Sequence, residues 1–243
     1  MVAVRRSGGA SREAQAREAR GTAQGTKREV SSKHMATFHD SKCRLCRREG
    51  EKLFLKGARC FTEKCAFERR GYAPGEHGKD RRSKETSYGL QLRMKQKTRR
   101  IYGILERQFR NYFAKAESQK GVTGENLLLM LERRLDNIAF RMGFVSSRAA
   151  ARRLVGHRHV MVNGKIVDVP SFQVKVGDEV SVKPGSRSNA HILASIDQSK
   201  GRDMMSWITV DYEKFTGRVL EYPTRASIPT KVTEQLIVEL YSK

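Results

Sequence analysis

Residues 131–167 read LERRLDNIAFRMGFVSSRAAARRLVGHRHVMVNGKIV, in which two helical patterns precede a hairpin signal. The first pattern has a capping position at Thr123, shows apolar residues at helical spacing and stops at Gly143. Its apolar residues are Leu127, Leu128, Leu131, Leu135, Ile138 and Met142. The second pattern begins after Ser146, turns its alanines, leucine and valine inward, and ends at Gly156. The spacing therefore predicts two helices joined by a short connection.

The hairpin signal is Asn163-Gly164, a residue pair that strongly favours a two-residue turn between antiparallel strands. Strands are predicted on either side of it, at 160–162 and 165–167. Further valines alternate around a turn at Gly177-Asp178 and extend the sheet; they are Val174, Val176, Val180 and Val182. We therefore expect a small α/β module in which two helices pack on a small antiparallel sheet.

Upstream, residues 87–116 predict a helix with one apolar face, formed by Leu90, Met94, Ile101, Leu105, Phe109 and Tyr112. Basic residues fall between these positions: Arg93, Lys95, Lys97, Arg99, Arg100, Arg107 and Arg110. Only Glu106 and Glu117 lie between positions 93 and 117 to neutralise them. We therefore expect this face to contact an RNA backbone. A solvated surface helix is the alternative.

All four cysteines fall close together in the sequence, as Cys43-x2-Cys46 and Cys60-x4-Cys65. Four thiolates converging at about 2.3 Å from the metal make a structural zinc site. An iron–sulfur cluster is the alternative, because it also takes four thiolates. A disulfide pair is less favoured, since the sequence carries no secretion signal. Full cysteine ligation leaves no open position for a substrate water, so we expect no catalytic metal and no histidine ligand.

The segment after the last cysteine reads FERRGYAPGEHGK over positions 67–79, and its glycines and proline predict an extended loop. Such a loop is suited to laying the guanidinium groups of Arg69 and Arg70 on phosphates and the ring of Tyr72 on a base. An ordinary solvated loop is the alternative.

The chain has 49 Lys and Arg against 26 Asp and Glu, a formal net charge of +23, which points to nucleic acid as partner. The net charge is +5 over 1–34, +12 over 35–130, +6 over 131–188 and zero over 189–243. We interpret the basic part of the chain, 1–188, as facing a polyanion and the neutral end as facing protein. No apolar run suits a membrane span or a secretory signal, so an intracellular protein is expected.

The N-terminal segment 1–34 contains few large apolar side chains and is expected to be disordered in isolation. It is interpreted either as a basic arm that contacts RNA or as a segment outside the working protein. The second interpretation includes an expression tag, a start misassigned upstream of Met35, and an organellar leader.

Several segments together resemble the bacterial small-subunit ribosomal protein S4 family, in order and over about residues 38–243. They are CRLCRREG (43–50), RRGYAPG (69–75), RRIYG (99–103), LERRLDN (131–137), VNG (162–164) and EQLIVELYSK (234–243). The resemblance implies a non-enzymatic protein of the cytoplasmic small ribosomal subunit. It also implies that the module at 132–195 is the small RNA-binding domain named after this family.

The resemblance further implies what such a protein binds. Its expected target is the five-prime domain of small-subunit ribosomal RNA, at a multi-helix junction, where it nucleates assembly of the subunit body. Expected neighbours are ribosomal proteins S5 and S3 and messenger RNA near its entry channel, with a contribution to translational accuracy. No homo-oligomer is expected. The end of the chain is expected to be partly sheet and partly a helix near 233–240 that returns to the first domain.

The fold class expected is α+β, with a mainly helical, metal-stapled N-terminal domain and the small α/β module. The expected domains are an extension at 1–34, a helical ribosomal-RNA-binding domain at 35–130 completed by 219–243, and the module with its following elements at 131–218. The expected RNA-binding residues are Arg44, Arg47, Arg48, Arg69, Arg70, Tyr72, His77, Lys79, Arg93, Lys95, Lys97, Arg99, Arg100, Arg107, Arg133, Arg134, Arg148, Arg152, Arg153, His157, Arg158, His159 and Lys165.

Two other function classes fit less well. An RNA-modifying enzyme would need a catalytic domain, and the stretch 186–243 that follows the module is too short for one. Upstream there is no phosphate-cradling loop and no open metal site. A zinc-ribbon DNA-binding regulator would concentrate its arginines on one recognition helix, whereas here they spread over two domains. The sequence therefore favours an RNA-binding protein without catalytic activity.

Overall fold

The structure is a computed structural model and describes residues 38, 40–79, 86–201 and 205–242. The expected N-terminal extension at 1–34 lies outside the described residues. The described residues form two hydrophobic cores, and the chain passes from one to the other between Leu131 and Leu135.

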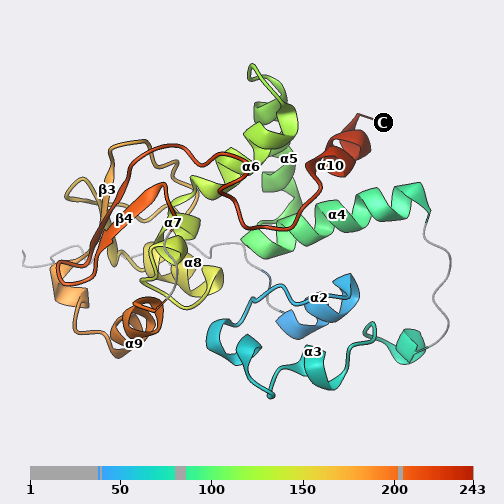
Figure 1. Ribbon diagram of the computed structural model, residues 1–243, viewed down its shortest axis with the longest axis horizontal. Helices are drawn as coiled ribbons and strands as arrows, with labels where there is room; N and C mark the ends of the chain where they lie inside the picture. Colours follow the sequence, from blue (N-terminus) through green and yellow to red (C-terminus); the bar gives the residue numbers. More distant parts are fainter. Residues whose placement is uncertain (1–37, 39, 80–85, 202–204, 243) are drawn as a thin grey trace, which may run out of the picture. The chain divides into compact units, whose positions relative to one another are not determined.

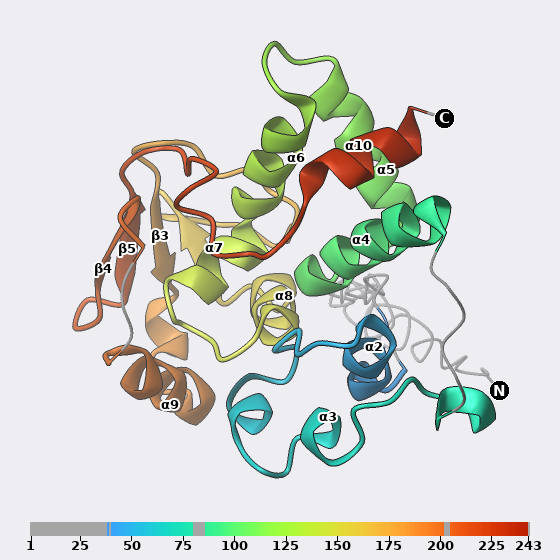
Figure 2. The ribbon, with the colours of Figure 1, turned by 45° about the vertical axis from the view of Figure 1, so that its right-hand side comes forward.

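The first core is helical. Its elements are α2 (Lys42–Glu49), η1 (Gly57–Phe61), α3 (Ala66–Arg69), η2 (Glu76–Lys79), α4 (Ser87–Tyr102), α5 (Glu106–Glu117), α6 (Thr123–Glu132) and α10 (Glu234–Tyr241). The C-terminal helix α10 packs against α4 and α6 (Figures 1 and 2). Tyr241 of α10 stacks on Phe113 of α5, with ring centroids 4.4 Å apart. The end of the chain thus completes a core to which Cys46 of α2, near the start of the described chain, also belongs.

The single helix predicted over 87–116 is wrong, because the structure has two helices there. Thr86 caps α4 by accepting a 3.1 Å hydrogen bond from the N–H of Gly89. Gly103 then adopts a left-handed conformation at φ +66°, which ends α4 and redirects the chain into α5. As a result Leu105 does not join the apolar face and is exposed.

The helix predicted from Thr123 to Gly143 is likewise divided, into α6 and α7 (Leu135–Arg141). Arg134 between them is extended and forms an isolated antiparallel bridge with Gln173. The N–H of Leu135 donates to the carbonyl of Phe172 at 2.9 Å. Pairing with a segment distant in the sequence therefore overrides the helical periodicity at this point.

The second core combines a sheet with α7, α8 (Arg148–Gly156) and α9 (Ala190–Ser199), with η3 (Pro184–Ser186) leading into α9. The described strands are β1 (Val160–Val162), β2 (Lys165–Ile166), β3 (Glu179–Val182), β4 (Ile208–Asp211) and β5 (Thr216–Val219). They form one antiparallel sheet in the order β2-β1-β3-β5-β4, which Figure 1 shows beside α7 and α8. The α+β class and the small antiparallel sheet are confirmed.

The hairpin forms at the predicted turn, with Val162 opposite Lys165 and both Asn163 and Gly164 at positive φ. The alternation of valines holds only in part. Val174, Val180 and Val182 are buried, but Val176 is 45% exposed and lies outside any strand. Among the described residues, no helix combines the length and the apolar character that crossing a membrane requires.

Candidate nucleic-acid interface

A groove with a cavity volume of about 880 Å³ runs between the start of α2, the loop 55–59, α8 and α9. We call it the basic groove. Its ionisable lining residues are Asp40, Lys42, Lys56, Arg59, Arg153, His157, His159 and His191. Of the described residues that line it, Asp40 alone is acidic. A groove with this lining suits a polyanion.

The segment that carries Lys56 and Arg59 approaches the start of α8 closely at Gly57. Gly57 has φ +63° and lies so close to Ser146 that a Cβ would stand 2.7 Å from the Ser146 carbonyl oxygen. Only glycine fits there without displacement, because the conformation and the space both exclude a side chain. The close approach brings the two cations of the loop to the beginning of α8.

Two helices begin at the groove. Ser147 caps α8, its hydroxyl accepting a 3.3 Å hydrogen bond from the N–H of Ala150. Asn189 caps α9 by accepting a 2.9 Å hydrogen bond from the N–H of His191. Both caps are lining residues, so the partial positive charge of both N-termini adds to the field of the cations.

Lys42, the first residue of α2, shows that the cations of the groove repel one another. Its pKa lies below the ordinary value for lysine because of burial and because of the nearby charges of Arg153 and Lys56. Among the described residues, Arg153 and Lys56 have no ion-pair partner within 4.0 Å. An anion in the groove would relieve this repulsion.

The histidines lie along the same wall. The rings of His157 and His159 have centroids 6.3 Å apart, and a 2.8 Å hydrogen bond links Nδ1 of His159 to the hydroxyl of Ser186. His191 follows the cap of α9 and is exposed. The predicted residues Arg153, His157 and His159 therefore come together. Sequence reasoning missed Lys42, Lys56, Arg59 and His191.

The cations of the face expected on α4 all pair with acids of the protein, five cations with three carboxylates. Arg93 and Arg100 both pair with Glu49 of α2, whose side chain is only 2% exposed. Lys97 pairs with Glu51 at 2.8 Å. The remaining two cations, Lys95 and Arg99, pair with Glu106 at 2.7 and 3.7 Å. Counting acids along α4 and α5 alone could not find Glu49 and Glu51, which lie far upstream in the sequence.

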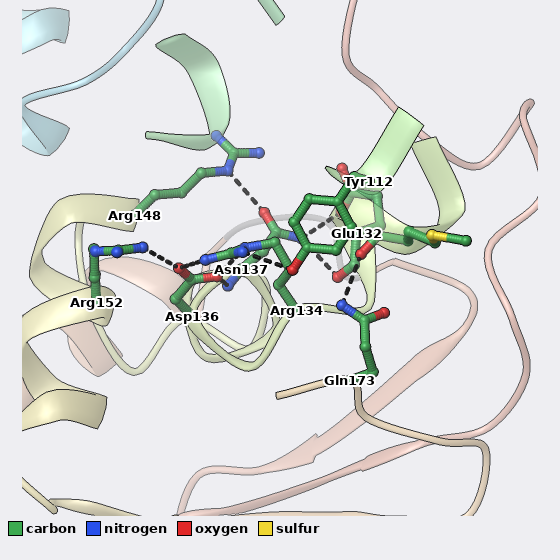
Figure 3. A network of polar contacts seen from close by, with 9 residues as sticks. Tyr112, Glu132, Arg134, Asp136, Asn137, Arg148, Arg152 and Gln173 are labelled. Atoms are coloured by element: carbon green, nitrogen blue, oxygen red, sulfur yellow. Dashed lines mark hydrogen bonds and ion pairs between the residues drawn. The ribbon is translucent and has the colours of Figure 1, made fainter. Parts of the chain in front are cut away.

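Arg134 does not belong to an exposed surface. It is fully buried, and its guanidinium donates to both carboxylate oxygens of Asp136 at 3.0 and 2.6 Å and to the hydroxyl of Tyr112 at 2.8 Å (Figure 3). Burial opposes its charge, but Asp136 raises the pKa of Arg134 above its ordinary value. The expectation that Arg134 binds RNA is therefore corrected: the residue joins α5 to α7.

Arg148 and Arg152 are half-buried and also take part in this network (Figure 3). Arg148 donates to Asn137 Oδ1 at 2.7 Å, with its guanidinium over the ring of Tyr102 at 5.0 Å. Burial lowers the pKa of Arg148 to about 10, with the charge of Arg141 as a second cause. Arg152 lies 3.5 Å from the Asp136 carboxylate. On α8, therefore, Arg153 is the cation that faces solvent.

Glu132 is the buried centre of the network. It accepts hydrogen bonds from the hydroxyl of Tyr102 at 2.6 Å, from Asn137 Nδ2 at 2.6 Å and from Arg141 at 3.0 and 2.7 Å. Burial alone would raise its pKa, but Arg141 and these donors hold the pKa of Glu132 at about 2. The network ties α4 and α6, which belong to the first core, to α7 of the second.

The loop 67–79 is held to α2. Arg47 donates to the carbonyls of Tyr72 and Ala73 at 2.9 and 3.2 Å, and its guanidinium lies 5.0 Å from the centroid of the Tyr72 ring. Lys79 lies over the same ring at 5.3 Å. Other predicted residues of α2, this loop and the start of α5 are exposed: Arg44, Arg48, Arg69, Arg70, His77 and Arg107.

The other predicted residues of the second core lie outside the groove. Arg133 donates to the carbonyl of Val174 at 3.1 Å and lies over the Tyr222 ring at 4.4 Å. Arg158 pairs with Asp168 at 3.1 Å. Lys165 is exposed in the hairpin.

The four cysteines surround a single small cavity of about 10 Å³, which is also lined by Lys42, Leu55, Lys56 and Phe67. Three of them are buried, Cys43 is half-buried, and all four are free thiols. Burial and the neighbouring thiols raise the pKa of Cys46. Four soft sulfur atoms that line one cavity are the donor set of a zinc or iron–sulfur site. Among the described residues, however, no three His, Cys, Asp or Glu side chains are close enough together to hold a metal ion.

The chain is similar to known proteins over most of its length. The family described as "Ribosomal protein S4/S9 N-terminal domain" matches residues 37–132, and the "S4 domain" matches residues 133–180. The small ribosomal subunit proteins uS4 of Natranaerobius thermophilus and Syntrophomonas wolfei are each 56% identical to this chain over 209 residues. That of Acidobacterium capsulatum is 54% identical over the same length. Each match covers 86% of this chain and 100% of the relative.

Proposed function

The chain belongs to the ribosomal protein S4 family, and from that premise we propose how it takes its place in the small ribosomal subunit. Proteins of this family are structural components and not enzymes, and this chain is such a component that binds ribosomal RNA. The observation that carries the proposed mode of binding is the basic groove, where four Lys and Arg side chains meet two helix N-termini with one acid among the described lining. Phosphates bound there release counterions and neutralise the mutual repulsion of the cations.

The RNA proposed is the five-prime domain of small-subunit ribosomal RNA, at a junction of several helices, bound early so that the body of the subunit assembles around it. The basic groove supports one contact surface for the RNA. The exposed arginines of α2 and the loop 67–79 support a second contact surface. The buried network of Glu132 connects the two cores and so fixes the two contact surfaces relative to each other. A fixed arrangement of contact surfaces suits recognition of RNA shape.

We propose that the two cores correspond to two domains, 35–130 completed by 219–243, and 131–218. Support comes from the passage between the cores at residues 131–135 and from the packing of α10 on α4 and α6. The neutral C-terminal region is proposed to face ribosomal proteins. S5 is the first neighbour, with S3 and messenger RNA near the entry channel, so that the protein contributes to translational accuracy in the cytoplasm. The exposed Leu220 and Tyr222 of this region support a protein contact.

For the cysteines we propose a structural zinc ion, with an iron–sulfur cluster as the alternative. The cavity they line has about the volume of one bound water, and contraction of the four thiols around an ion would supply the ligation distances. When bound, the ion would cross-link α2 to η1 and α3, a segment with few apolar residues of its own. Metal analysis of the purified protein should then give one zinc per chain. Cys43→Ser should lower that content and weaken RNA binding, and a metal-free wild-type protein would refute the site.

The experiment that tests the function measures binding of the full chain to the five-prime-domain RNA and to an unrelated folded RNA of equal length, across a salt series. We expect tight binding to the ribosomal fragment that persists near physiological salt, and weaker, steeply salt-dependent binding to the other RNA. Equal affinity for both would reduce the protein to a general RNA binder and contradict the proposal.

A further inference from the structure

Two phenylalanines stand exposed beside the basic groove: Phe54, which lies between the two cysteine pairs, and Phe61, which follows Cys60 at the end of η1. Phe54 is 44% exposed and Phe61 is 68% exposed. Their rings stack on each other with centroids 4.9 Å apart and an interplanar angle of 27°. One face of a ring is thus covered by the other, and most of Phe61 remains open to solvent. Large apolar side chains in such a position are candidates for a binding contact.

The backbone holds the pair in place. Phe54 is in the left-handed region at φ +51°, which is uncommon for a bulky residue and costs of the order of 1 kcal/mol or more. Its neighbour Leu53 is buried in the first core, so the strained turn sends Phe54 outward after an inward residue. At the other end, the hydroxyl of Thr62 donates to the carbonyl of Arg59 at 3.1 Å. The stacked pair of phenylalanines is thus carried by a segment of defined backbone conformation.

The charges around the phenylalanine pair indicate which kind of molecule binds there. Lys56 and Arg59 lie between the two phenylalanines in sequence, and both line the basic groove. Lys64 follows, and Glu63 is the one acid from position 53 to position 64. Phe54 also lines a second hollow together with Lys42, a cation of the basic groove. The arginines of that hollow are bound within the protein: Arg100 to Glu49, Arg148 to Asn137 and Arg152 to Asp136. An exposed ring with Lys56 and Arg59 next to it suits a flat aromatic group attached to phosphates, which is the chemistry of a nucleotide.

We propose that the outer face of Phe61 stacks against an unpaired base of the bound RNA, while Phe54 supports the ring from behind. The phosphates next to that base lie on Lys56 and Arg59. This inference rests on the proposed function and deepens it, because it adds a contact to single-stranded RNA beside the shape-based contacts of the groove. It predicts that the RNA target includes a bulged or looped nucleotide at this position.

The test uses the full chain, with Phe61→Ala, Phe61→Leu and Phe61→Trp, and Phe172→Ala as the matched control at an exposed phenylalanine that does not line the groove. Each variant is titrated with the five-prime-domain RNA over a salt series. We expect Phe61→Ala and Phe61→Leu to bind about 10-fold more weakly at every salt concentration, because stacking is lost. The salt slope stays that of the wild type, since no charge is removed. Phe61→Trp and Phe172→Ala should bind within about twofold of the wild type.

Unchanged affinity of Phe61→Ala would overturn the inference, and so would wild-type affinity of Phe61→Leu, because a flat ring would then not be required. The same titrations with a single-stranded polyuridylate separate this inference from the proposed function. If the wild-type protein shows no preference for the ribosomal fragment, the proposed function fails. The order of affinities among the Phe61 variants on polyuridylate still decides whether bases stack on this ring.

Discussion

The hydroxyl of Tyr102, the last residue of α4, donates a 2.6 Å hydrogen bond to the carboxylate of Glu132, the last residue of α6. Both side chains are buried, and the same carboxylate accepts two hydrogen bonds from Arg141 of α7. One acid therefore connects three helices at the boundary between the two cores. A charge in this position is stabilising only while all its partners are present.

Glu132→Gln should destabilise the protein strongly. The substitution keeps the size of the side chain but leaves the largely buried guanidinium of Arg141 without its counter-charge, and we expect a loss of about 3 kcal/mol in the free energy of unfolding. Chemical denaturation measures this loss. Glu117→Gln, at the exposed end of α5, is the control and should change stability by less than about 0.5 kcal/mol. Equal effects of the two substitutions would show that the network contributes little.

The stability of the protein should decrease at acid pH because the carboxylate of Glu132 becomes protonated. The pKa of Glu132 is about 2 in the folded protein against 4.5 in the unfolded reference, so the folded state favours its ionised form. Its contribution, about 3 kcal/mol by linkage, is complete above pH 4.5 and decreases as the pH falls toward 2. Unfolding experiments from near-neutral pH down into acid should show this decrease in the wild type and a smaller one in Glu132→Gln. Parallel curves would contradict the assignment.

Gly57→Ala should weaken RNA binding as well as stability. Its Cβ would meet the carbonyl of Ser146, so the loop carrying Lys56 and Arg59 must move away from α8. Gly50→Ala is a matched control, since Gly50 also has a positive φ, +71°, but has nothing within 4 Å of the added carbon. Both variants should lose about 1 kcal/mol of stability from the backbone conformation. Only Gly57→Ala should also lose RNA affinity; a loss of affinity in both would mean that the contact with Ser146 does not position the groove.

The sequence predicts local features of the fold well and long-range pairing poorly. Asn163-Gly164 forms its hairpin because the turn conformation is a property of those two residues. The break at Arg134 could not be predicted, since it depends on a backbone bridge to Gln173. Long-range contacts also limit what the sequence predicts about the nucleic-acid interface. The basic residues of α8 and the hairpin predict Arg153, His157 and His159 as a shared surface, and the three line one groove. The pairing of the α4 cations, in contrast, depends on acids that only the packing of α2 brings near.

The basic groove can be separated from the ion-paired face of α4 by one comparison. A Lys42→Ala, Arg153→Ala double variant and an Arg93→Ala, Lys97→Ala double variant each remove two positive charges, the first pair from the groove and the second from α4. Binding of each to the five-prime-domain RNA is measured over a salt series. The groove variant should bind more weakly, with a salt slope reduced by about one to two units. The α4 variant should keep the slope of the wild type, because its cations already pair with acids of the protein. A reduced slope in the α4 variant together with an unchanged slope in the groove variant would contradict the account.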